Sequence, residues 1–189
     1  MRVIAGSRRH LTLKTVPGMA VRPTQDRTKE TLFNSISPYL ADCRFLDLFS
    51  GSGAIGIEAL SRGADTVVMV EQSPESLACI KENLKTTRLT EEARLLSMDV
   101  FRAIPQLETE GKAFDIIFMD PPYDNELEKR VLTLLADSCL INEDTIIIVE
   151  ASLQTDFSYL DDLGLELFRE KKYKNNQHVF IRTWEKEPA

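Results

Sequence analysis

The stretch Asp47-Leu48-Phe49-Ser50-Gly51-Ser52-Gly53-Ala54-Ile55-Gly56 decides how the rest of the chain is interpreted. It places the pattern GxGxxG between an apolar, strand-like segment and a segment with helical character. Glycines at such a junction allow a tight turn and let a ligand approach the backbone closely. The stretch therefore predicts a strand, a ligand-binding loop and a helix, which together form the first unit of an α/β fold.

The segments around this unit continue the alternation. Helices are predicted at 24–38, 54–61, 74–86 and 127–137, with a short one after Asp99, and strands at 44–49, 66–71, 93–98, 114–119 and 145–150. This order is typical of a mostly parallel sheet with helices on both faces. Two last strands, near 165–173 and 178–183, are predicted to pair across a turn at 174–177. We therefore expect a seven-stranded α/β sheet with an antiparallel C-terminal hairpin.

The N-terminal region differs in charge from the rest of the chain. The whole chain has a net charge of −7, yet residues 1–30 hold seven basic and two acidic side chains. A basic arm on an acidic body can dock on phosphates while the body repels them, although an ordinary solvated basic terminus has the same pattern. We predict a small hairpin arm over 1–20 and one larger domain over 21–189.

Carboxylates near the glycine loop indicate which ligand it binds. Glu71 ends the next strand, where it can accept hydrogen bonds from ribose hydroxyls, which suits a dinucleotide as well as a nucleoside-type cofactor. Asp47 would repel a pyrophosphate but would favour a cation such as the sulfonium or ammonium of S-adenosylmethionine. Asp99 is placed to accept from an adenine amino group or, equally, to cap the next helix. Arg22 suits a cofactor carboxylate or an RNA phosphate.

A second motif, Asp120-Pro121-Pro122-Tyr123, directly follows the predicted strand 114–119. Asp-Pro-Pro-aromatic is a signature of enzymes that methylate planar amino nitrogens, whose lone pair is delocalised. The Asp120 side chain and the Pro121 carbonyl can accept from the two amine hydrogens, and Tyr123 offers a face for base stacking. A strand end with a proline stop and a core tyrosine is the structural alternative.

At these residues the chain resembles the bacterial small-subunit ribosomal RNA guanine-N2 methyltransferases. The matching stretches are Arg2-Val3-Ile4-Ala5-Gly6, Arg22-Pro23-Thr24, Arg27-Thr28-Lys29-Glu30, Leu32-Phe33-Asn34, Asp47 to Ala64, Glu71, Asp99 and Asp120 to Tyr123. The resemblance implies a Rossmann-like methyltransferase domain with an N-terminal hairpin that helps to hold RNA. It also implies methylation of one guanine N2 in 16S rRNA, with an assembled or partly assembled 30S subunit as the substrate.

Residue roles follow from the motifs and the resemblance together. The expected catalytic residues are Asp120, Pro121 and Tyr123. The expected cofactor contacts are Arg22, Thr24, Asp47, Phe49, Ser50, Gly51, Gly53, Glu71, Gln72, Asp99, Val100 and Asp120. The basic residues expected at the RNA are Arg2, Arg8, Arg9, Lys14 and Arg27.

Other readings remain open from the residues themselves. A methyltransferase acting on adenine N6 in DNA or on a protein glutamine amide would use a similar tetrapeptide. A nicotinamide-dependent oxidoreductase and a non-catalytic RNA-binding factor are the alternatives from other classes. The three scattered cysteines are predicted to be buried, and without a Cys/His cluster we expect no metal site. With no apolar stretch that could span a bilayer, we expect a cytoplasmic protein. No extended apolar stripe is left over after the sheet and helices are assigned, so we expect a monomer.

Overall fold

A seven-stranded sheet forms the centre of the structure, a computed structural model that describes residues 1–16, 23–122 and 126–184. Its strands are β1 (Arg44–Leu48), β2 (Thr66–Glu71), β3 (Ala93–Ser97), β4 (Ile116–Met119), β5 (Ile146–Ser152), β6 (Leu165–Lys172) and β7 (Asn176–Thr183). Their order is β3-β2-β1-β4-β5-β7-β6, and β7 is antiparallel to both of its neighbours. The order reverses at β1 and β4, so the ligand crevice is expected at their carboxyl ends. The predicted α/β sheet with a C-terminal hairpin is confirmed.

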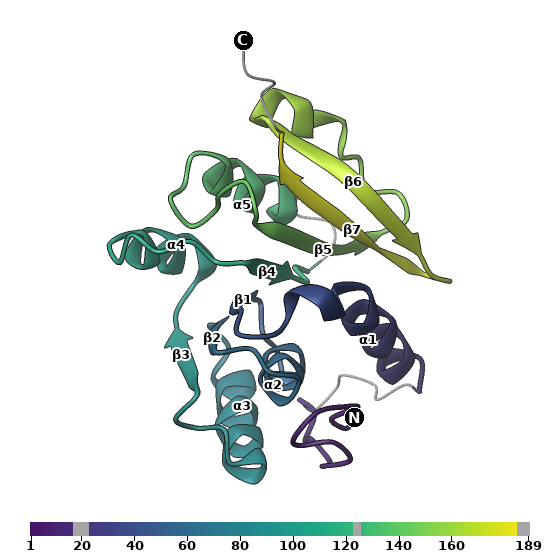
Figure 1. The fold of residues 1–189 in the computed structure, drawn as a ribbon, viewed down its shortest axis with the longest axis vertical. Coiled ribbons are helices and arrows are strands. Elements are labelled where there is room, and N and C mark those ends of the chain that lie inside the picture. The colour runs from purple at the N-terminus through teal and green to yellow at the C-terminus, as the bar shows by residue number, and fades with distance from the viewer. Residues whose placement is uncertain (17–22, 123–125, 185–189) are drawn as a thin grey trace.

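Helices cover both faces of this sheet (Figure 1). One face carries α1 (Pro23–Ile36), α2 (Ala54–Ser61) and α3 (Pro74–Thr87), and the other carries α4 (Val100–Glu108) and α5 (Leu127–Ala136). Two short 3-10 segments, η1 (Ser37–Tyr39) and η2 (Ser158–Leu163), were not predicted from the sequence. No helix among the described residues has the length and apolar character needed to cross a bilayer.

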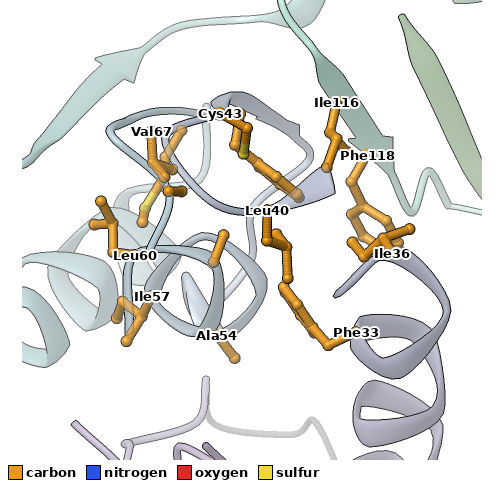
Figure 2. Close-up of a cluster of buried hydrophobic side chains, with 14 of the residues drawn as sticks. Phe33, Ile36, Leu40, Cys43, Ala54, Ile57, Leu60, Val67, Ile116 and Phe118 are labelled. Carbon is orange, nitrogen blue, oxygen red and sulfur yellow. The ribbon is translucent and has the colours of Figure 1, made fainter. Parts of the chain in front are cut away.

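The face under α1 to α3 packs the glycine-loop helix tightly onto the sheet. Figure 2 shows Ile36 of α1 close to Phe118 of β4, and Phe33 stacks on Phe45 with ring centroids 6.4 Å apart. A Cβ on Gly56 of α2 would lie 2.5 Å from the Cε of Met69 in β2. The third glycine of GxGxxG is therefore required by close packing between helix and strand.

The N-terminal arm is fastened to α2 and contributes to the same core. Its predicted hairpin is reduced to one antiparallel bridge between Arg2 and Thr12, and Val3 and Leu13 are buried. Gly6 has a φ of +84°, and a Cβ there would lie 1.7 Å from the carbonyl oxygen of Ser61. The described part of the arm therefore packs directly against α2 and the core beside it.

Two predictions about the C-terminal half are corrected. The turn predicted at 174–177 is shorter, because Asn176 and Gln177 already belong to β7 and pair with Ser152 and Ala151 of β5. The Gln177 amide donates to the Ser152 carbonyl at 2.8 Å, which stabilises these polar residues in the strand. Cys139, predicted to be buried, is exposed, whereas the other two cysteines are buried.

Candidate active site

Four carboxylates lie at the carboxyl edge on one face of the sheet. Each stands two residues after a side chain of the core under α1 to α3, so strand alternation puts all four on that face. In the spatial order β2, β1, β4 and β5 they are Glu71, Asp47, Asp120 and Glu150. Residues from positions 47 to 150 therefore converge on one edge, where α/β sheets bind ligands.

Asp47 is the most deeply buried member of this row, at 1% exposure. Its Oδ2 accepts a hydrogen bond from the Gly56 amide at 3.2 Å, but its Oδ1 has no partner among the described residues. Burial raises the pKa of this carboxyl to about 7, with a further contribution from Glu71. A buried carboxylate oxygen without a partner is costly, and a cationic group would compensate it.

Glu71 holds the glycine loop in place. Its Oε2 accepts from the Gly51 amide at 2.8 Å, and its Oε1 accepts from the amides of Gln72 and Ser73, both at 2.8 Å. These bonds fix the orientation of the carboxylate. Because Oε1 already accepts two hydrogen bonds, the further acceptor position is on Oε2. The predicted contact between Glu71 and a ribose is compatible with this arrangement and stays a prediction.

The rest of the predicted cofactor loop has a strained but well-bonded backbone. Phe49 is a non-glycine residue with a φ of 66°, and Gly53 precedes α2 with a φ of 76°. The Ser50 hydroxyl donates to the Asp47 carbonyl at 2.8 Å, and the Gly53 amide donates to the Ser50 carbonyl at 2.7 Å. Left-handed backbone at a non-glycine position is uncommon and is often found at functional sites.

At the third strand, Asp99 caps α4. Its Oδ1 accepts from the Phe101 amide at 2.8 Å, as the structural alternative predicted. Val100 is buried in the first turn of that helix. One Asp99 oxygen is therefore used by the cap, and the predicted adenine contact would have to use the other.

Asp120 and Pro121 follow β4. They flank Asp47 on one side, and Glu71 flanks it on the other. The Asp120 side chain is exposed at the edge of the sheet. The pKa of its carboxyl is raised by the protein atoms that crowd around it and then by the charges of Glu150 and Asp47. Pro121 is buried and lines a cavity of about 420 Å³. Two predicted residues, Arg22 and Tyr123, lie outside the described residues, as does the side chain of Thr24.

A relay of side chains that sequence reasoning missed lies beside Asp120. Glu150 accepts from Asn176 and contacts His178, whose Nε2 is 3.0 Å from the Glu150 Oε2. The other ring nitrogen of His178 is 3.1 Å from the Tyr173 hydroxyl. Glu150 is on β5, whereas Asn176 and His178 are on β7 and Tyr173 lies just before that strand, so only the pairing of β5 with β7 brings Glu150 to the others.

A second missed cluster anchors the arm. Glu58 of α2 is fully buried and accepts from the Ile4 and Ala5 amides at 2.8 and 3.0 Å. It also forms ion pairs with Lys29 at 3.1 Å and Arg62 at 2.8 Å. Lys29, counted from the sequence as part of a surface basic arm, is only 5% exposed and is therefore not available to phosphates.

The basic residues predicted to contact RNA are mostly at the surface. Arg9 and Arg27 are exposed, Arg2 is near Asp26 at 3.9 Å, and Lys14 is paired with Glu82. Arg8 is half-buried, and its Nε has no partner among the described residues. Exposed arginines suit phosphate contacts, but no RNA is present and their role stays a prediction.

The arm and the glycine loop share one buried side chain. Asn83 of α3 donates to the Ser52 carbonyl of the loop at 2.9 Å and to the Lys14 carbonyl of the arm at 3.0 Å. Its Oδ1 accepts from the Lys14 amide at 2.8 Å. The position of the loop is therefore linked to the position of the arm.

Known proteins share this arrangement of fold and sequence. The family described as conserved hypothetical protein 95 matches residues 1–182. YlbH of Bacillus subtilis, provisionally named an rRNA methyltransferase, is 43% identical over 79% of this chain and 82% of its own. Ribosomal RNA small subunit methyltransferase D of Escherichia coli is 33% identical over 82% of this chain and 76% of its own.

A solved structure extends the likeness to nearly the whole chain. The Escherichia coli protein YhhF, provisionally described as a methyltransferase, superposes with a TM-score of 0.81 at 32% identity. The superposition covers 97% of this chain and 98% of that one. The glycine loop and the row of carboxylates are compatible with that activity. Because the family matches nearly the whole chain and the relatives are methyltransferases, this chain belongs to the conserved hypothetical protein 95 family and is a methyltransferase.

Proposed function

We propose that this methyltransferase transfers a methyl group from S-adenosylmethionine to the exocyclic N2 amine of one guanine in 16S rRNA. The observation that supports it most directly is the placement of Asp120 beside Asp47 at the carboxyl edge, where an acceptor amine and a cationic donor can meet. The relatives named for ribosomal RNA methylation support the choice of substrate.

The cofactor half of the edge suits S-adenosylmethionine. The Asp47 oxygen without a partner fits a cationic cofactor, and the Glu71 carboxylate is oriented to accept from ribose hydroxyls. Asp99 and the backbone around Val100 would contact the adenine, and Arg22 and Thr24 the cofactor carboxylate. When bound, this cofactor supplies an electrophilic methyl group. The chain itself supplies orientation and charge, which is the larger part of catalysis in such a transfer.

On the acceptor half, Asp120 accepts from one hydrogen of the guanine amine, and the Pro121 carbonyl accepts from the other. These contacts orient a nitrogen whose lone pair is delocalised into the base. The base reaches them only after leaving its stack, and Tyr123 provides the surface on which it stacks. Asp120, which holds the amine hydrogen, also takes up the proton that the amine loses after methyl transfer.

The substrate is the 16S rRNA in an assembled or partly assembled 30S subunit, which the enzyme meets as a cytoplasmic monomer. The exposed arginines of the arm and of α1, Arg9 and Arg27, contact RNA phosphates and position the subunit. Because the body of the protein is acidic, with a net charge of −7 for the chain, only a limited basic surface faces the RNA.

The test uses S-adenosylmethionine with a labelled methyl group and small subunits from cells that lack this gene. We expect one N2-methylguanosine per subunit, mapped to one site by mass spectrometry of the digested RNA. DNA and total protein are incubated in parallel as acceptors. If the label appears on adenine N6 of DNA or on a glutamine amide, that group and not guanine is the substrate. If no acceptor is labelled, the proposal is wrong.

A further inference from the structure

Glu150 stands beside Asp120 at the end of the neighbouring strand. The last registered pair of β4 and β5 joins Met119 to Val149, so Asp120 and Glu150 are the next residues of each strand. Among the charged groups around it, Glu150 raises the pKa of Asp120 the most. The acceptor edge therefore has two adjacent carboxylates, and only one of them is needed to hold the amine.

The surroundings of Glu150 fix it as a hydrogen-bond acceptor. A carboxylate only accepts, so the His178 nitrogen that contacts Glu150 is the donor, which leaves the neutral ring's Nδ1 to accept from the Tyr173 hydroxyl 3.1 Å away. His178 then carries its proton on Nε2 and donates it to Glu150. Asn176 donates to the other Glu150 oxygen. Both oxygens are thus held in place by donors from β7, and each retains a free acceptor position.

The two carboxylates match the donor pattern of guanine. Guanine presents N1–H next to its N2 amine, whereas adenine and cytosine present an acceptor nitrogen next to their amine. A carboxylate held as an acceptor would bind the guanine edge and repel the other two. Resting on the proposed function, we propose that Glu150 selects guanine by accepting its N1–H while Asp120 holds the N2 amine.

A cavity lies next to Glu150, and Asp120, which precedes the lining residue Pro121, is not itself part of the lining. The cavity of about 420 Å³ is lined by both Pro121 and Glu150, and its other walls come from α5, the end of β5 and the segment that leads into η2. A pocket of this size falls in the range that encloses small ligands. Tyr159 also lines this cavity, and its buried hydroxyl has no partner among the described residues.

The test measures kcat/KM on three reconstituted small subunits whose 16S rRNA differs only at the mapped target nucleotide, which is guanine, 2-aminopurine or adenine. 2-Aminopurine keeps the N2 amine but lacks both N1–H and O6, and comparison with the Glu150→Gln variant separates the two losses. For the natural protein we expect a loss of roughly 10- to 100-fold with 2-aminopurine, as for a hydrogen bond to a charged group. With guanine as the target, Glu150→Gln should lower kcat/KM by a similar factor. With 2-aminopurine, the variant should have nearly the same kcat/KM as the natural protein, and its preference for guanine over adenine should be smaller.

The controls separate selection from folding and from the proposed function. Glu143→Gln makes the same charge change at an exposed site and should leave all three rates unchanged. Binding of S-adenosylmethionine should be equal in both variants. If the natural protein methylates guanine and 2-aminopurine equally well, the role of Glu150 is wrong even if its variants misfold. If Glu150→Gln lowers both rates equally, the residue has a structural role. If no guanine is methylated at all, the proposed function fails first.

Discussion

The two halves of the carboxyl edge are built in different ways. In the cofactor half, Glu71 and Asp47 are bonded to backbone amides of the glycine loop, of the first turn of α2 and of the turn after β2. In the acceptor half, Glu150 is held by side chains of β7, and Asp120 lies next to a like charge. Backbone amides are fixed by the chain trace, whereas side-chain networks depend on every member.

This difference teaches where each half obtains its specificity. A rigid backbone cradle suits a cofactor that never changes. A side-chain network can be tuned to a particular acceptor by replacing single residues, as the Glu150–His178–Tyr173 relay illustrates. We therefore expect substitutions in the two halves to separate cofactor binding from methyl transfer.

The largest separation is expected for Asp120→Ala. This change removes the acceptor for the amine hydrogen, and transfer to RNA should fall at least about 100-fold, since misplacement of a reacting group by an ångström has effects of that size. Asp120→Asn keeps one acceptor oxygen and should lose less. Single-turnover methyl transfer measures both, with isothermal titration of S-adenosylmethionine as the control. An Asp120→Ala protein that methylates RNA at the natural rate would remove this residue from the site.

Asp47→Asn should give the opposite result, with cofactor binding affected first. Loss of the charge facing the cofactor should weaken its binding roughly 10- to 100-fold, the range for a hydrogen bond between charged groups. The same change should stabilise the unliganded protein above neutral pH by roughly 2–4 kcal/mol, because a buried carboxylate with a raised pKa opposes folding. Calorimetry and urea denaturation measure the two effects.

The sign of the pH dependence gives a second check on Asp47. Its pKa is 3.8 in the unfolded chain and about 7 in the fold, so the folded state binds more protons between these values. Stability of the unliganded natural protein should therefore fall as the pH rises from about 4 to about 7. The fall should be smaller in Asp47→Asn and with saturating S-adenosylmethionine. An equal slope in all three samples would mean that Asp47 titrates normally.

The same contrast explains what the sequence could predict. Helix α2 and strand β2 match their predicted bounds, since the glycine loop and the apolar runs are local signals. Asp47, Gly51 and Glu71 follow from the spacing of one βαβ unit, and the structure brings them together. The cofactor half is thus encoded within a short stretch of chain.

The acceptor half could be predicted only in part. Asp120 is marked by its tetrapeptide, but Glu150 and His178 belong to no motif, and their contact depends on the register of an antiparallel pair. Lys29 was misread for a similar reason, because its partner Glu58 is on another helix. A weak signal existed, since an isolated glutamate inside an apolar helix such as 54–61 requires a partner.

The smallest effect is expected where the cofactor half meets the arm. Asn83→Ala removes the bonds to Ser52 and Lys14 and leaves buried backbone groups without partners, which should lower stability by about 1–3 kcal/mol. If the arm helps to hold the loop, cofactor affinity should also fall, by roughly 3- to 10-fold.

Thr87→Val is the matched control. It lies one turn later on α3 and is also buried, but its hydroxyl bonds only to carbonyls of its own helix. Cofactor titration and urea denaturation of both variants decide the matter. If Asn83→Ala loses stability but binds the cofactor as tightly as Thr87→Val does, the loop holds its shape without the arm, and the backbone bonds to Glu71 are sufficient.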